Sequence, residues 1–165
     1  MLGQDLDLGN SLLSLQVCIL KPPLKTWNIK DISFLSPFFD SQVKEGLAEV
    51  QKTLKVGDVQ DFSNFMSAVI DKKAFDRISG YIDHAKSSPN TKIVAGGTYD
   101  ESVGYYIQPT VVETTSKDDR IFKEEIFGPV VTAFVYPDSQ AKTIVDHIGK
   151  DTPYALTGAI YSQDQ

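Results

Sequence analysis

The alternation of helical and β-rich segments after residue 40 is the feature that most constrains the fold. Between residues 41 and 54, apolar residues recur at intervals of four, three and four, which lays one apolar stripe along a surface helix. A second stripe follows Asp71, whose side chain can cap a helix that ends at the Ser-Ser-Pro-Asn run 87–90. A third helix is predicted over residues 139–149. Runs rich in β-branched and aromatic residues complete the pattern at 92–97, 104–113, 129–137 and 157–162.

Helices that alternate with short β-rich runs indicate an α/β layer structure. The part of the chain before residue 41 differs, because Pro22, Pro23 and Pro37 stand there among scattered bulky apolar residues and neither period persists. We therefore divide the chain into an irregular N-terminal segment, residues 1–40, and a folded α/β region, residues 41–165.

Charge and composition exclude several classes of function. Sixteen basic and twenty-two acidic residues give a net charge of -6, without a Lys/Arg cluster that could follow a phosphate backbone, so nucleic acid is not an expected partner. No apolar run approaches the roughly 20 residues of a membrane span, so no membrane association is expected. One cysteine, Cys18, and two distant histidines, His84 and His147, predict neither a disulfide framework nor a zinc site. We read the histidines as structural or solvated, and Asp118-Asp119 as a solvated turn rather than a metal site.

The run Lys-Glu-Glu-Ile-Phe-Gly-Pro-Val, residues 123–130, is the strongest candidate for chemistry. Its two acids, Glu124 and Glu125, fall in a turn before a β-rich run, and loops at strand ends often carry ligand contacts in α/β proteins. A carboxylate can accept hydrogen bonds from both hydroxyls of a ribose, and an adjacent aromatic face can lie against a flat heterocycle. The alternative is a solvated pair of acids before a turn, and this stretch alone favours that alternative.

This run resembles a motif of the aldehyde dehydrogenase superfamily, and further matches are dense. They include KVGD at 55–58, AGG at 95–97 and YALTGAIYSQD at 154–164. The resemblance covers residues 42–164 and implies that residues 41–165 are part of the family's catalytic domain, an open, twisted, mostly parallel sheet flanked by helices. The longer run 87–138 most resembles the branch of the family that oxidises L-glutamate γ-semialdehyde to L-glutamate with NAD in mitochondrial proline catabolism.

Carried over residue by residue, the resemblance implies cofactor contacts for two residues of the turn. Glu125 matches the glutamate that binds the nicotinamide ribose of NAD, and Phe127 matches the aromatic residue beside the nicotinamide. Glu124, Gly128 and Pro129 are expected to shape the turn. Glycine would do so by permitting an unusual backbone angle, and proline by fixing the next one.

The chain also departs from the family. There an activated cysteine attacks the aldehyde and a hydride leaves for NAD, whereas residues 25–31, where the cysteine would fall in register, read KTWNIKD. Cys18 lies in VCILKPP and is predicted to be an ordinary thiol. We find no catalytic residue in the chain, nor the glycine-bearing turn of a cofactor domain or a general-base glutamate. Activity is therefore not expected of this chain by itself.

Binding of NAD by this chain alone is expected to be weak or absent. A hydrogen bond to a charged group contributes about 1.5 to 3 kcal/mol, whereas even millimolar affinity needs about 4 kcal/mol. Two alternatives to an enzyme fragment stay open: a non-catalytic truncated form that docks on full-length subunits, and a gene-model artefact. A mitochondrial matrix location is implied by the resemblance alone, because Asp5 and Asp7 precede the first base, Lys21, and no transit peptide is visible.

Overall fold

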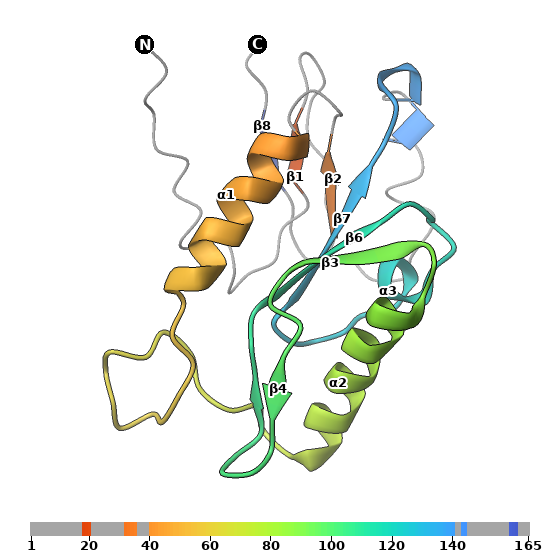
Figure 1. Ribbon diagram of the computed structural model, residues 1–165. Coiled ribbons are helices and arrows are strands. Elements are labelled where there is room, and N and C mark those ends of the chain that lie inside the picture. The colour runs from red at the N-terminus through yellow and green to blue at the C-terminus, as the bar shows by residue number, and fades with distance from the viewer. Residues whose placement is uncertain (1–17, 21–31, 36–39, 141–142, 145–158, 162–165) are drawn as a thin grey trace, which may run out of the picture.

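The structure of the protein is a computed structural model that describes residues 18–20, 32–35, 40–140, 143–144 and 159–161. Its main feature is a six-stranded sheet with the order β3-β6-β7-β2-β1-β8 (Figure 1). β3 is antiparallel to β6, and all other neighbouring strands of this sheet are parallel. The predicted α/β class, with a mostly parallel sheet flanked by helices, is confirmed. The strands are β1 (Cys18–Leu20), β2 (Ile32–Leu35), β3 (Thr91–Ala95), β6 (Thr110–Thr114), β7 (Val130–Val135) and β8 (Ala159–Tyr161), and a separate hairpin pairs β4 (Tyr99–Asp100) with β5 (Tyr106–Ile107).

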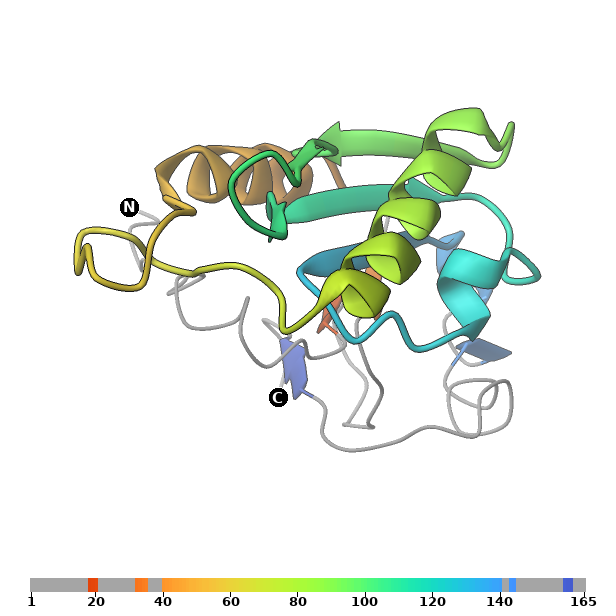
Figure 2. The ribbon, with the colours of Figure 1, turned by 90° about the horizontal axis from the view of Figure 1, so that it is seen from below.

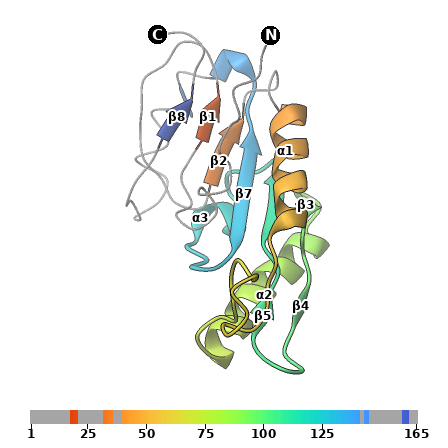
Figure 3. The same cartoon turned by 90° about the vertical axis from the view of Figure 1, so that its left-hand side faces the viewer.

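Two helices cover opposite faces of the sheet. In Figure 2, α2 (Lys72–Ser87) lies in front of the strands and α1 (Asp40–Thr53) lies behind them. The alternation of side chains along β6 agrees with this, because Val112 belongs to the core under α2 whereas Glu113 forms a 2.9 Å ion pair with Lys44 of α1. Figure 3 shows β8, β1, β2 and β7 in succession on one side of α1.

The first two predicted helices are confirmed. Asp71 caps α2 as predicted, since its carboxylate accepts a 2.7 Å hydrogen bond from the Ala74 N–H. Residues 138–140 form a short 3-10 turn, η1 (Asp138–Gln140), and most of the predicted third helix lies outside the described residues. Among the described residues, no helix is long and apolar enough to cross a bilayer.

Two strands come from the segment 1–40, for which we predicted irregular structure. β1 pairs in parallel with β2 and β8, and β2 pairs in parallel with β7. The prediction was wrong at these positions because strands of three and four residues are too short to display an alternating period. Cys18 is the first residue of β1 and is paired with Ala159 of β8. The other residues of the segment, apart from Asp40 at the start of α1, lie outside the described part of the chain.

The β-rich run 104–113 also differs from the prediction, because it forms two strands rather than one. β5 pairs with β4, and β6 joins the main sheet between β3 and β7. Pro109 separates them, since proline has no N–H to donate to a strand ladder. The Gln108 N–H donates instead to the Thr98 carbonyl at 2.9 Å.

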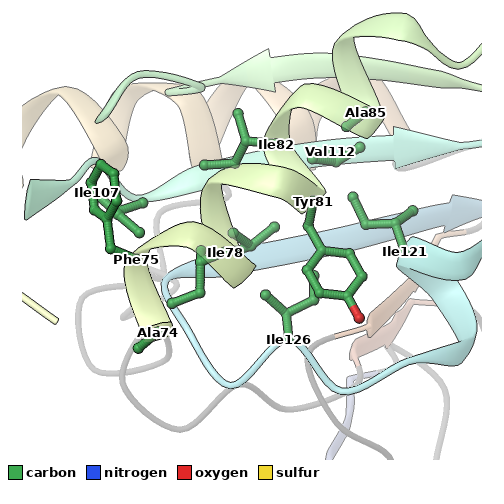
Figure 4. Close-up of a cluster of buried hydrophobic side chains, with 11 residues drawn as sticks. Ala74, Phe75, Ile78, Tyr81, Ile82, Ala85, Ile107, Val112, Ile121 and Ile126 are labelled. Atoms are coloured by element: carbon green, nitrogen blue, oxygen red, sulfur yellow. The ribbon is translucent and has the colours of Figure 1, made fainter. Parts of the chain in front are cut away.

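The core lies between α2 and the sheet. Figure 4 shows the apolar face of α2 directed at the strands, with Ile126 beneath it. Gly96 and Gly97 form the predicted turn after β3, both with positive φ, at 75° and 84°. The buried cluster comprises Ala74, Phe75, Ile78, Tyr81, Ile82, Ala85, Ile107, Val112, Ile121, Ile126 and Val130.

Candidate functional site

The turn 123–130 connects a one-turn helix, α3 (Arg120–Lys123), to the first residue of β7. It therefore lies at the amino end of β7. Ligands of open α/β sheets usually lie at the carboxyl ends of the strands. The position of the turn in the sheet therefore gives no reason to expect a ligand here, and the candidate site depends on the side chains of the turn itself.

Glu124 attaches the start of the turn to two helices. Its carboxylate accepts a short hydrogen bond from the Tyr81 hydroxyl of α2 and a 3.2 Å hydrogen bond from Arg120 of α3. Its N–H donates to the Arg120 carbonyl at 2.9 Å. The Tyr81 hydroxyl, aided by the Arg120 charge, lowers the pKa of Glu124, so this carboxylate is ionised at neutral pH. Glu124 thus shapes the turn, as predicted.

Gly128 shapes the turn for a reason other than the predicted one. It does not adopt a positive φ. Instead, a Cβ atom at Gly128 would lie 2.5 Å from Cδ1 and 2.8 Å from Cγ1 of Ile78, which is fully buried. The glycine is needed because α2 approaches the backbone closely at this point. Pro129 then aligns the turn with the sheet, since its carbonyl accepts a 2.9 Å hydrogen bond from the Thr110 N–H.

Phe127, rather than Gly128 as predicted, has the unusual backbone φ angle. Its φ is 52°, a left-handed conformation that is uncommon for a bulky residue. Its side chain is 77% exposed, and its carbonyl accepts a 3.4 Å hydrogen bond from Arg77 of α2. A strained backbone that holds a large aromatic ring in solvent is typical of ligand-binding positions.

Alternate positions of the turn, 124, 126 and 128, are held against α2 or in the core. Glu124 bonds to α2, Ile126 is fully buried, and Gly128 abuts Ile78. Between these anchors lie Glu125, which is half-buried, and Phe127, which is exposed. The structure therefore presents a carboxylate and an aromatic ring two residues apart on an anchored segment. This combination suits a ligand with a diol next to a flat ring.

A second polar cluster lies beside the turn. Asp119 is buried and accepts hydrogen bonds from Nε2 of His84 at 2.8 Å, from the Ser88 hydroxyl at 3.0 Å and from the Ile121 N–H at 3.1 Å. His84 thus makes a structural contact, which is one of the two roles predicted for it, whereas the solvated role predicted for Asp119 is wrong. Asp118 is 89% exposed and pairs with Lys123 at 2.6 Å. Within the described residues, no group of acidic, histidine and cysteine side chains could hold a metal ion.

Comparison with known proteins assigns the family. A model of the aldehyde dehydrogenase family matches residues 34–165. The chain belongs to this family. The match begins inside the segment 1–40, so the family's sequence extends further toward the N-terminus than the resemblance at residues 42–164 indicated.

Individual aldehyde dehydrogenases narrow the relationship. The chain is 53% identical over 125 residues to delta-1-pyrroline-5-carboxylate dehydrogenase, mitochondrial, of Danio rerio, and 48% identical to the Homo sapiens protein of the same name. These matches cover 75% of the chain but only 22% of each relative. The predicted resemblance to the proline-catabolism branch is confirmed, as is the fragmentary coverage.

Solved aldehyde dehydrogenase structures agree with the fold. The delta-pyrroline-5-carboxylate dehydrogenase of Mycobacterium tuberculosis superposes with a TM-score of 0.75 and 27% identity, covering 90% of this chain and 31% of that one. A structure of the same enzyme bound with NAD gives a TM-score of 0.71 at 27% identity. The described part of the chain therefore has the architecture of part of an aldehyde dehydrogenase.

The sequence analysis missed two residues that contact the candidate site, Tyr81 and Arg120. Arg120 could have been found, because it precedes Glu124 by four residues and such a spacing favours an ion pair on a helix. Tyr81 could not, because its partner lies 43 residues away and only the fold brings the two together. His147 lies outside the described residues.

The buried Asp119 predicts an acid-sensitive step in stability. Burial raises the pKa of Asp119, but the hydrogen bonds from Ile121, His84 and Ser88 outweigh it and the pKa lies below the ordinary value. A depressed pKa adds stability that is present above the unfolded-state pKa of about 3.9 and is lost as pH falls through the folded-state value. We expect the urea midpoint of the wild type to fall more between about pH 5 and pH 3 than that of Asp119→Asn.

The neighbouring Asp118 supplies the control for this measurement. Asp118→Asn removes the same charge from an 89% exposed side chain, where solvent screening keeps the contribution small. Its urea midpoints are expected to follow those of the wild type. An Asp119→Asn variant with the full acid dependence of the wild type would contradict the assignment.

Proposed function

We propose that the chain is a segment of the catalytic domain of an NAD-dependent aldehyde dehydrogenase that oxidises L-glutamate γ-semialdehyde to L-glutamate in the mitochondrial matrix. The names of the relatives from Danio rerio and Homo sapiens support the substrate and the compartment. The observation that carries the proposal is the turn 123–130, in which Glu124, Ile126 and Gly128 fix a segment that also carries the Glu125 carboxylate and the exposed ring of Phe127.

Two residues of the turn hold the nicotinamide half of the cofactor in this proposal. The Glu125 carboxylate accepts hydrogen bonds from the hydroxyls of the nicotinamide ribose, and Phe127 lies beside the nicotinamide ring. NAD supplies the hydride acceptor when it is bound. The exposure of Phe127 and its left-handed backbone support this role, because the ring faces away from the protein's own core.

The 165-residue chain by itself is proposed to be inactive. Its one cysteine, Cys18, lies in VCILKPP, which is unlike the family's nucleophile loop, and residues 25–31, where the nucleophile would fall in register, contain no cysteine. Binding of NAD to this chain alone is proposed to be weaker than millimolar, because the turn contributes contacts to only one half of the dinucleotide. Isothermal titration of the purified chain with NAD checks this, and saturation below about 1 mM would contradict it.

Exposed apolar side chains favour a second candidate function, a truncated form that docks on full-length subunits. In the part of the chain that the structure describes, Phe62 and Ile70 project from the connection between α1 and α2, and Val103 projects from the β4–β5 loop. The Val69 N–H donates to the Tyr105 carbonyl at 2.9 Å and so joins these two segments. Co-expression with a tagged full-length subunit tests this candidate, and separate elution on size exclusion would remove it.

A chimaeric enzyme tests the proposed role of Glu125. The matching 125 residues of this chain replace their counterpart in the Danio rerio enzyme, and Glu125→Gln is introduced into the chimaera. We expect KM for NAD to rise about tenfold, because the amide loses the charge that strengthens the bonds to the ribose. Steady-state kinetics with varied NAD measures the effect.

The control variant is Glu101→Gln, which makes the same chemical change in the β4–β5 hairpin, where Glu101 pairs with Lys72 at 2.8 Å. It is expected to leave KM for NAD unchanged. Kinetics of Glu125→Gln equal to those of the parent would exclude the ribose contact. An inactive parent chimaera would contradict the equivalence of the two segments.

A further inference from the structure

One face of α2 holds the turn that carries the proposed cofactor contacts. Arg77, Ile78 and Tyr81 lie at positions i, i+1 and i+4 of the helix, which places them on one side of it. Arg77 bonds to the carbonyl of Phe127, Ile78 meets Gly128, and Tyr81 bonds to Glu124. Three successive parts of the turn are thus fixed to one rigid element.

Tyr81 is the anchor whose side chain is held most firmly by its surroundings. Its side chain is only 4% exposed, and Figure 4 shows the ring reaching from α2 past Ile126, with the hydroxyl at its far end. The Arg120 guanidinium lies 4.4 Å from the centre of the ring. The packing around the ring therefore fixes the position of the hydroxyl before it meets Glu124.

The bond from Tyr81 outweighs the other interaction of the Glu124 carboxylate. Arg120 and Glu124 are both half-exposed, with side-chain exposures of 49% and 50%, and exposed ion pairs contribute little. A hydrogen bond from a buried hydroxyl to an ionised carboxylate holds the Glu124 side chain more strongly. Without it, the carboxylate of Glu124, which directly precedes Glu125, keeps the solvent-screened pair with Arg120.

We propose that Tyr81 is a positioning residue for the cofactor-binding turn: its hydroxyl holds Glu124 and thereby sets where Glu125 and Phe127 meet the nicotinamide half of NAD. This inference rests on the proposed function of the turn. Tyr81 itself touches neither cofactor nor substrate, so its removal affects NAD binding and leaves aldehyde binding unchanged. The inference extends the site from the turn into the core of the domain.

Hydrogen exchange of the 165-residue chain tests the mechanical part of the inference without any activity. Tyr81→Phe removes only the hydroxyl and is expected to speed exchange in a peptide over residues 123–130 by about tenfold, with β6 unchanged. Tyr99→Phe is the matched control, because the Tyr99 hydroxyl bonds to Asp83, also on α2, at 2.7 and 2.8 Å. Equal exchange of the turn in the wild type and in Tyr81→Phe would overturn the inference.

Kinetics of the chimaeric enzyme test its consequence for the cofactor. Tyr81→Phe is expected to raise KM for NAD about fivefold to tenfold, with KM for the aldehyde and kcat within twofold of the parent. Tyr99→Phe is expected to change none of these constants. A rise in both KM values, or in neither, would overturn the inference.

Glu124→Ala removes the same contact by changing its half-exposed partner. It therefore serves as a second variant in case Tyr81→Phe impairs folding. It is expected to match Tyr81→Phe, and the double variant to be no worse than either single one, because both remove one contact. Additive effects would overturn the inference.

If Glu125→Gln raises KM for NAD but Tyr81→Phe does not, the inference fails while the proposed function stands. If Glu125→Gln has no effect, the proposed function fails and hydrogen exchange alone decides whether Tyr81 holds the turn.

Discussion

Ile78→Ala is expected to lower the free energy of unfolding by about 2 to 5 kcal/mol. Ile78 is fully buried at the centre of the cluster between α2 and the sheet, so the shortened side chain leaves a cavity that the surrounding strands cannot fill. The same change removes the atoms against which Gly128 rests. Urea unfolding followed by circular dichroism measures the loss.

Ile70→Ala is the matched control for this prediction. It deletes the same atoms from a side chain that is 92% exposed, and surface changes of this kind are usually within about 0.5 kcal/mol. A large difference between the unfolding free energies of the two variants is therefore expected. Equal unfolding free energies for Ile78→Ala and Ile70→Ala would show that the core does not lie where the structure places it.

Gly96→Ala is expected to lower the free energy of unfolding by about 2 to 4 kcal/mol. A Cβ atom at this position would lie 2.0 Å from the carbonyl oxygen of Pro109 and 2.9 Å from the Cα of Thr110. These are backbone atoms of the segment that leads into β6, so relief requires a shift of the strand itself. The φ of 75° adds strain for any residue with a side chain.

Gly80→Ala is expected to change the free energy of unfolding in the opposite direction from Gly96→Ala. Gly80 lies within α2, and within 4 Å a Cβ atom there would meet nothing beyond the neighbouring backbone of the helix itself. Replacing a helical glycine by alanine stabilises by about 0.5 to 1 kcal/mol. The two Gly→Ala variants should therefore differ in sign, as measured by the midpoints of urea unfolding. A stabilised Gly96→Ala would contradict the tight turn after β3.

The sequence predicted the elements whose periodicity extends over several residues. α1 and α2 show apolar stripes, and β3 and β7 are runs of β-branched residues, so all four were found. β1 and β2 were missed because residues that are held by long-range pairing need not show a local period. The division of the run 104–113 was signalled by Pro109, and the proline rule for central strands would have placed the break there.

The sequence predicted which residues form the candidate site but not the contacts that hold them. The motif placed Glu124, Glu125 and Phe127 in a turn before a strand, and the structure has this turn. The role of Gly128 was attributed to backbone freedom, whereas its cause is the buried Ile78 on a helix some fifty residues earlier. Contacts of this kind depend on how α2 crosses the sheet, which local sequence does not encode.

The measurement that tests the central claim most directly is a crystal structure of the chimaeric enzyme with NAD bound. We expect a Glu125 carboxylate oxygen within about 2.6 to 3.2 Å of a hydroxyl of the nicotinamide ribose, with the Phe127 ring beside the nicotinamide. An ordered nicotinamide half that contacts neither residue would contradict it.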